Sequence, residues 1–210
     1  GDVDLTAADT ATIKVNGAAL TTGAAIASDG TLDLTGDLVT ISHDISALAL
    51  TIDASSDNGV TTGDMALVVN NANTLTTTTG DLTLKAVSVL DEGANDITVA
   101  VAANLVIDAD AGAGLVKVTT ASALALGDID LNAADTATIK VNGAALTTGA
   151  AITSAGTLDL TGDLVTISHD VSALALIIDA SSDNGATTGD MALVVNNANT
   201  LTTTGDMTLK

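Results

Sequence analysis

The sequence predicts an all-β protein, and specifically a parallel β-solenoid, in which short strands stack in successive turns of chain, or rungs. Three observations carry this prediction. Apolar and polar residues alternate with a period of two, the apolar residues are aliphatic, and a long segment of the chain occurs twice. Alternation over a few residues is typical of half-buried strands. A long internal repeat is typical of stacked architectures.

The strands are expected in short segments separated by turn residues. In residues 12–15, 31–35, 82–85, 97–101 and 116–119, aliphatic side chains alternate with Thr, Asp or Lys. Turn signals such as Asn16-Gly17 and Asp57-Asn58-Gly59 lie between these segments. Residues 46–50 contain Ala and Leu, which favour helices, but the leucines alternate and therefore predict one more strand. We expect many short strands and no long helix.

The composition favours a narrow interior. The 210 residues are 47% hydrophobic, yet Phe, Trp and Tyr are absent, so the core must be built from aliphatic side chains. Wide cores usually rely on aromatic residues, whereas an interior one or two side chains across does not need them. Proline is also absent, which leaves every backbone N–H available for strand pairing. The alternative fold is a pair of tandem β-sandwich domains, but sandwiches usually contain aromatic core residues.

The repeat divides the chain into two units. The segment that begins Gly1-Asp2-Val3 returns at Gly127-Asp128-Ile129, a shift of 127 − 1 = 126 residues. We expect a first unit at residues 1–126 and a second, incomplete unit at residues 127–210, within one continuous solenoid rather than independent domains. Irregular rungs of about 20 residues would give about ten rungs and a rod about 50 Å long.

The charge excludes several classes of partner. The chain has 26 acidic residues, five basic residues and a formal net charge of −21. No basic patch exists to bind nucleic acid, and an anionic membrane surface would repel the chain. No apolar run reaches the roughly 18 residues of a membrane span. The acidic residues are nearly all Asp, which suits a strand-and-turn protein that is extracellular, either secreted or at the cell surface.

Two kinds of loop are candidates for calcium. In the first, Asp, Asn and a turn glycine follow one another closely, as calcium-binding loops require. It occurs in both units, at Asp53, Asp57 and Asn58 and again at Asp179, Asp183 and Asn184. Asp108 and Asp110 form a second candidate with fewer ligands. No bidentate Glu follows, and the alternative is a tight Asn-Gly corner capped by Asp. Calcium is thus a candidate ligand, and no cofactor is required.

No residue set predicts catalysis. Ser42-His43-Asp44 recurs as Ser168-His169-Asp170. Adjacent residues cannot form a Ser-His-Asp triad along a strand, because neighbours face opposite sides. A polysaccharide-degrading enzyme would need aromatic and basic groups to hold sugar, and the chain has no aromatic residue. We expect that the protein is not an enzyme and that each His lies at the surface or at a rung corner.

The order in which residue types recur along the sequence resembles that in a known class of proteins. Gly-Asp openings such as Gly36-Asp37-Leu38 and Gly80-Asp81-Leu82 precede alternating aliphatic residues and Thr. In composition and rhythm, and over the whole chain, this resembles bacterial extracellular strand-repeat proteins such as the filamentous-haemagglutinin-like adhesins. The resemblance implies a β-helical extracellular stalk or fibre without an active site.

The expected function is structural. Both ends of the sequence resemble ordinary repeat, and neither resembles a capping segment that would cover the terminal strands of a solenoid. Uncapped solenoid ends expose unpaired backbone groups, which favour end-to-end growth. The chain is therefore expected to be a protomer, or an ordered segment, of an extracellular filament whose partners are copies of itself joined head to tail. The alternative is the rigid stalk region of a large bacterial surface adhesin.

Overall fold

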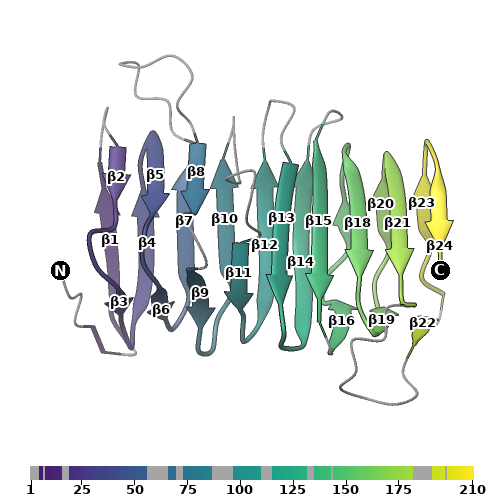
Figure 1. The fold of residues 1–210 in the computed structure, drawn as a ribbon, viewed down its shortest axis with the longest axis horizontal. Helices are drawn as coiled ribbons and strands as arrows, with labels where there is room; N and C mark the ends of the chain where they lie inside the picture. Colours follow the sequence, from purple (N-terminus) through teal and green to yellow (C-terminus); the bar gives the residue numbers. More distant parts are fainter. Residues whose placement is uncertain are drawn as a thin grey trace.

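Parallel strands that stack side by side make up the described part of the chain (Figure 1). The computed structural model describes residues 5–6, 8–15, 19–55, 66–69, 73–86, 97–109, 115–131, 135–142, 144–181, 191–196 and 198–210. These residues form strands and turns without a helix, so the all-β prediction is confirmed. Over the same ranges, no helix is long and apolar enough to cross a membrane.

The strands form two long sheets and two short ones. The first long sheet contains, in spatial order, β1 (Thr10–Lys14), β4 (Thr31–Thr35), β7 (Leu50–Ala54), β10 (Leu82–Ala86), β12 (Asn104–Ala109), β14 (Leu124–Leu131), β16 (Ala145–Thr148), β19 (Leu164–Ile167) and β22 (Ala192–Val195). The second long sheet contains β3 (Ile26–Ala27), β6 (Ile45–Ala47), β9 (Thr74–Thr77), β11 (Ile97–Ala100), β13 (Leu115–Thr120), β15 (Thr136–Val141), β18 (Thr157–Thr161), β21 (Ala175–Asp179) and β24 (Met207–Leu209). The first short sheet contains β2 (Ala19–Thr21), β5 (Leu38–Ile41) and β8 (Ala66–Val69), and the second contains β17 (Ile152–Thr153), β20 (Val171–Ala173) and β23 (Leu201–Thr203).

Each strand pairs in parallel with the strand one turn of chain before or after it. Leu32 of β4, for example, lies beside Ala11 of β1 on one side and beside Leu50 of β7 on the other. Strands of the two long sheets, such as β12 and β13, run in opposite directions, as the chain returns on the far side (Figure 1). This architecture is compatible with a parallel β-solenoid. β-Sandwich domains would instead contain antiparallel pairs.

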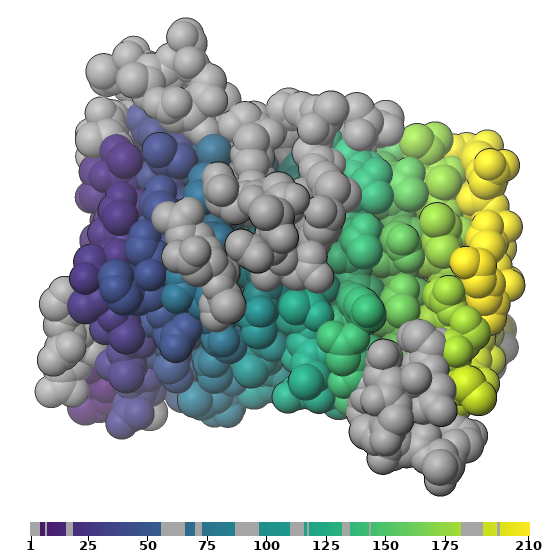
Figure 2. All heavy atoms as spheres, in the orientation of Figure 1, coloured from purple at the N-terminus to yellow at the C-terminus, as the bar shows by residue number. Residues whose placement is uncertain are grey.

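The described residues form nine successive turns of chain along the long axis, since each long sheet contains nine described strands. The first three turns and the last three contain three described strands each, whereas the turns of β10, β12 and β14 contain two. Sequence order follows the long axis from one end to the other (Figure 2).

The core is a thin aliphatic column between the sheets. In β4, Leu32 and Leu34 point inward with 0% and 1% of their surface exposed, and Asp33 between them is half-exposed. The same alternation of buried and half-exposed residues recurs in β7, β10, β12 and β18. Strand periodicity therefore predicted the inward faces correctly.

The strand expected over residues 46–50 is wrong in its extent. β6 ends at Ala47 and β7 begins at Leu50, and the two half-buried residues between them form a bend. The chain has to turn there from the second long sheet to the first. Leu48 takes part in this corner by donating its backbone N–H to Gly30 O at 2.9 Å.

Equivalent strands of the two repeat units lie in different sheets. The TATIK segment forms β1 in the first long sheet, but its second copy begins β15 in the second long sheet. TLDLT likewise forms β4 in the first long sheet and β18 in the second. The second copies are displaced by one sheet around the axis, because 126 residues do not return the chain to the sheet from which it started.

Candidate functional site at the ends of the strand stack

The C-terminal end of the stack exposes residues of the core type. Met207 and Leu209 of β24 are 39% and 49% exposed, whereas the residues that they repeat, Leu82 and Leu84 of β10, are both 0% exposed. β10 is covered on its far side by β12, with Leu82 beside Leu105. Among the described strands, β24 is the last of its sheet and pairs only with β21. The larger exposed fractions in β24 arise because this strand lacks a second neighbouring strand, and not because of the type of side chain.

The N-terminal end behaves in the same way. Ala11 and Ile13 of β1 are half-buried, whereas their repeats in β15, Ala137 and Ile139, are both 0% exposed. β15 lies between β13 and β18, whereas β1 pairs only with β4 among the strands that the structure describes. Both ends therefore present apolar side chains that the interior of the stack would bury.

Exposed apolar residues concentrate near the C-terminal end. Among the described residues, the large hydrophobic side chains with the most exposure are Leu174, Met191, Val194, Val195, Met207 and Leu209. Most of them belong to, or directly precede, the last turn of β22, β23 and β24, coloured yellow-green to yellow in Figure 2. In the described part of the chain, each end strand also has one edge with no strand beside it, and such edges are templates for further pairing.

The two Ser-His-Asp segments are corners that join three turns of chain. Nδ1 of His169 lies 3.0 Å from the carbonyl oxygen of Thr148 in the preceding turn. Asp170 Oδ1 accepts the backbone N–H of Thr200 in the following turn at 2.8 Å. In the first unit, His43 contacts Thr22 O at 3.2 Å and Asp44 accepts from Thr74 N at 2.8 Å. The His and Asp side chains thus bond to different turns, and each His lies at a corner, as expected.

A buried hydroxyl supports each of these corners. Thr148 is 1% exposed, and its Oγ1 accepts the backbone N–H groups of Ser168 at 2.8 Å and His169 at 3.0 Å. We expect Thr148→Val to lower the free energy of unfolding by about 1–3 kcal/mol, because it leaves two backbone donors without this acceptor. The matched control is Thr147→Val, since Thr147 is the half-exposed neighbour on the outer face. Urea unfolding followed by circular dichroism measures both, and equal effects would contradict this role of Thr148.

The described calcium candidates already have partners. Asp53 Oδ1 accepts from Ser55 N at 2.9 Å and from Ser55 Oγ at 2.5 Å. Asp179 makes the same two bonds to Ser181 at 3.0 and 2.5 Å, and its Oδ2 lies 3.5 Å from Lys210 Nζ. The hydrogen bonds from the Ser181 hydroxyl and backbone N–H, aided by Lys210, hold the pKa of Asp179 below its usual value. In both units, therefore, the Asp side chain at the end of the strand accepts two hydrogen bonds from the serine two residues later.

Of the remaining candidates, only Asp108 lies within the described residues. Asp108 Oδ2 lies 3.2 Å from Lys85 Nζ. Asp57, Asn58, Asp110, Asp183 and Asn184 lie outside the described residues. Within the ranges that the structure does describe, no three His, Cys, Asp or Glu side chains come close enough to hold a metal ion together.

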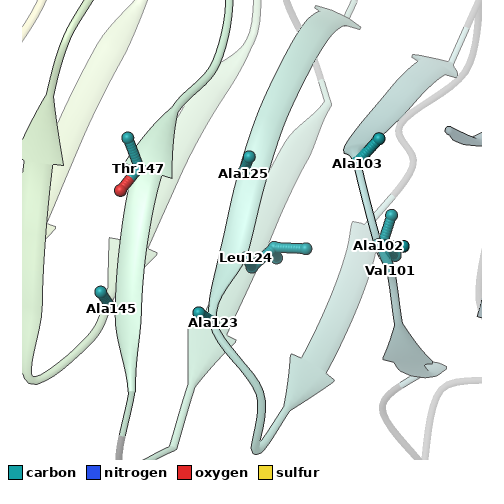
Figure 3. Close-up of a pocket in the computed structure, with 8 residues that line it drawn as sticks. All are labelled: Val101, Ala102, Ala103, Ala123, Leu124, Ala125, Ala145 and Thr147. Atoms are coloured by element: carbon teal, nitrogen blue, oxygen red, sulfur yellow. The ribbon is translucent and has the colours of Figure 1, made fainter. Parts of the chain in front are cut away.

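A shallow hollow of about 240 Å³ lies on the outer surface near the middle of the stack (Figure 3). It opens where Ala125, a small residue, is paired between Asn104 and Thr147. Its lining is Val101, Ala102, Ala103, Ala123, Leu124, Ala125, Ala145 and Thr147. Thr147 carries the only polar side chain of this set, whereas ligand pockets combine apolar walls with several directed polar groups. We therefore assign no ligand to the hollow.

Comparisons with known proteins find no family model, no curated protein and no solved structure that matches this chain.

Proposed function

We propose that the chain is a structural protein, a protomer or ordered segment of an extracellular filament that grows by end-to-end β stacking of identical copies. In this proposal the nine turns form a β-solenoid of irregular rungs, and the 126-residue units are parts of one continuous stack. The observation that carries the proposal is the contrast between Leu209 and Leu84. The same repeat position is 49% exposed at the end of the stack and 0% exposed inside it.

The two ends are chemically suited to each other. Both carry aliphatic side chains, and both have strand edges beside which the structure describes no further strand. Contact between one end and the other is a head-to-tail contact. Such a contact leaves a free end on each partner, so it propagates into a fibre unless rotation closes a ring. A straight stack does not close, and a filament follows.

The charge of the chain fits the same role. With a net charge of −21, the sides of neighbouring filaments repel each other at low ionic strength. The ends are less affected, because their contact surface is mainly apolar. We expect single filaments at low salt and lateral bundles when salt or divalent cations screen the repulsion.

Sedimentation velocity and negative-stain electron microscopy of the purified chain over a range of concentrations test the proposal. We expect rods of constant width whose mean length rises with concentration. A chain that stays monomeric at the highest attainable concentration would contradict filament formation. It would favour the alternative function, the stalk of a larger surface adhesin, in which further residues of the same chain cover the end strands.

The proposed filament requires no metal ion. The serine hydroxyls that donate to Asp53 and Asp179, and the lysine beside Asp108, support this part of the proposal, because they give these carboxylates partners other than calcium. We expect EDTA to leave the unfolding temperature unchanged, as followed by circular dichroism. An increase of several degrees with calcium, but not with magnesium at equal ionic strength, would show instead that the Asp-rich loops bind calcium.

A further inference from the structure

The outer face of the first long sheet carries charged side chains in one column, which we call the charged column. Its strands β1, β4, β7, β10, β12 and β14 follow one another along the long axis (Figure 1). Parallel pairing brings one outward position of each strand into line with the next. The side chains at these positions are all exposed or half-exposed. In order along the stack they are Lys14, Thr35, Asp53, Lys85, Asp108 and Asp130.

The charged column is complementary to its own reverse. If the column is turned end for end and laid against itself, Lys14 lies opposite Asp130 and Asp53 lies opposite Lys85. Each of these contacts occurs twice, which gives four Lys–Asp contacts. Thr35 lies opposite Asp108, so none of the six positions faces a like charge. A surface that complements itself in this way meets the requirement for a dimer with two-fold symmetry.

We infer that a second copy of the chain docks on this face in the antiparallel direction. The two-fold axis runs along the strand direction and passes between β7 and β10. The contact is on the side of the stack and not at its ends, so it does not depend on the proposed end-to-end growth. Charge complementarity of this kind selects the register and the direction of a contact more than it adds affinity.

Other two-fold arrangements of the same face bring like charges together. If one copy is shifted by one strand spacing, either Asp53 or Lys85 lies opposite its own counterpart. If the two copies run in the same direction, every charged residue of the column faces its own counterpart. Like charges opposite each other are unfavourable, and Asp53 opposite Lys85 avoids this in the antiparallel register.

The contact at the centre of the dimer joins Asp53 of one copy to Lys85 of the other. Lys85 Nζ lies 3.2 Å from Asp108 Oδ2 of its own chain. An ammonium group has three donors, so it can bond a second carboxylate as well. Both hydrogen bonds that Ser55 donates to Asp53 go to Oδ1. We expect Oδ2 of Asp53 to accept the bond from Lys85 of the second copy.

The neighbouring outward positions, two residues earlier on each strand, are mainly hydroxyls. Thr51 and Thr83 are paired within one chain, and in the dimer each faces the other residue of the second copy. Asp33 faces Val106, which offers it no hydrogen bond. Asp33 already accepts one from Thr12 Oγ1 of its own chain, at 3.4 Å. This position is therefore the least favourable of the contact.

The dimer is expected to be weak. The charged column has two lysines and three aspartates, a formal charge of 2 − 3 = −1, so its approach to a second copy is opposed less than the net charge of −21 suggests. Six strands of about five residues cover about 24 Å by about 16 Å, or about 400 Å² per copy. Contacts of this size belong to transient complexes. We expect dimers that dissociate on dilution.

Single cysteines test the direction and register, because the natural chain has no cysteine. In the dimer, Thr51 is displaced from Thr51 of the second copy by one strand spacing, whereas the two Thr12 residues are five spacings, about 24 Å, apart. A short bismaleimide should therefore give covalent dimers with Thr51→Cys and mainly monomer with Thr12→Cys. Contacts between stack ends do not give these products, since equivalent residues in the proposed filament are nine spacings, about 43 Å, apart.

Charge variants with Thr51→Cys as the common background test the role of Lys85. At about 0.15 M salt, where distant charges are screened, we expect Lys85→Asp to lower the association constant about tenfold or more. It turns two attractive contacts into two repulsive ones. Asp53→Lys/Lys85→Asp should restore cross-linking, because the central pairs are attractive again. The matched control is Lys140→Asp, which makes the same change on the outer face of the second long sheet and should leave cross-linking unchanged.

Cross-linking of Thr51→Cys that is lost with Lys85→Asp and regained in the double variant supports the inference. Equal loss with Lys140→Asp, a double variant that is folded but does not regain cross-linking, or efficient cross-linking of Thr12→Cys would overturn it. Circular dichroism of each variant establishes that it is folded. Filaments without lateral dimers would reject this inference alone, whereas lateral dimers without filaments would reject the proposed function alone.

Discussion

Leu84→Ala is expected to lower the free energy of unfolding by about 2–5 kcal/mol, because it removes a fully enclosed side chain and leaves a cavity. Leu84 is 0% exposed within β10, with Ile52 of β7 on one side and Ile107 of β12 on the other. The chain has no Trp or Tyr, so urea unfolding is followed by far-ultraviolet circular dichroism.

The matched control is Leu209→Ala. Leu209 is the repeat of Leu84, has the same side chain and the same inward orientation, but is 49% exposed. At concentrations where the chain is monomeric, we expect a cost below about 1 kcal/mol, because the site is already half open to water. Equal costs for the two variants would mean that the end of the stack is covered in the monomer, and the basis of the proposed filament would be lost.

Leu209→Asp is expected to abolish filament growth while leaving the monomer folded. In the monomer the new carboxylate remains hydrated at the end of the stack. In a filament it would be enclosed at every contact between copies, and burial of an unpaired charge costs several kcal/mol. A cost of about 3 kcal/mol raises the concentration needed for growth by more than a hundredfold. Light scattering and electron microscopy at increasing concentration measure this effect.

Thr208→Asp is the control for charge. Thr208 is adjacent to Leu209 in β24, but it is paired beside Ile177, whose side chain lies on the outer, half-buried face. The variant adds the same charge at the same strand without enclosing it, so filaments should still form. If both variants assemble, Leu209 does not lie in the contact. If neither assembles, added charge alone prevents growth.

The sequence could predict which segments form strands and which of their side chains point into the core. It could do so because successive side chains of a strand alternate between its two faces. Leu32 and Leu34 alternate with Thr31 and Asp33, and the structure places the leucines in the core. The same reasoning failed at residues 46–50. An alternating pattern does not reveal a corner, because the bend depends on where the neighbouring turns of chain change direction.

The placement of the repeat units could not be predicted. Periodicity states whether a residue faces inward or outward, but not which sheet its strand joins. That choice depends on how many residues each turn takes up, and the turns between β10 and β15 contain two described strands instead of three. Consequently β1 and β15 share the TATIK segment and lie in different sheets.

The sequence identified the two Ser-His-Asp segments as possible corners, but the hydrogen bonds that these residues make depend on the fold. The sequence showed Ser168, His169 and Asp170 as neighbours, which excluded a triad among them. Their partners Thr148 and Thr200 are 21 and 30 residues away in sequence. Only the pairing of successive turns brings these groups together, and no local pattern signals it.

Fibre diffraction of concentrated, aligned material is the most direct measurement of the proposed continuous strand stack. End-to-end stacking predicts a strong axial reflection near 4.8 Å from strands spaced along the filament. It also predicts an axial repeat of about 43 Å per copy, from nine strands per long sheet at that spacing. Filaments in which strand spacing is perpendicular to the long axis, or in which compact beads are joined without an axial 4.8 Å reflection, would contradict end-to-end stacking.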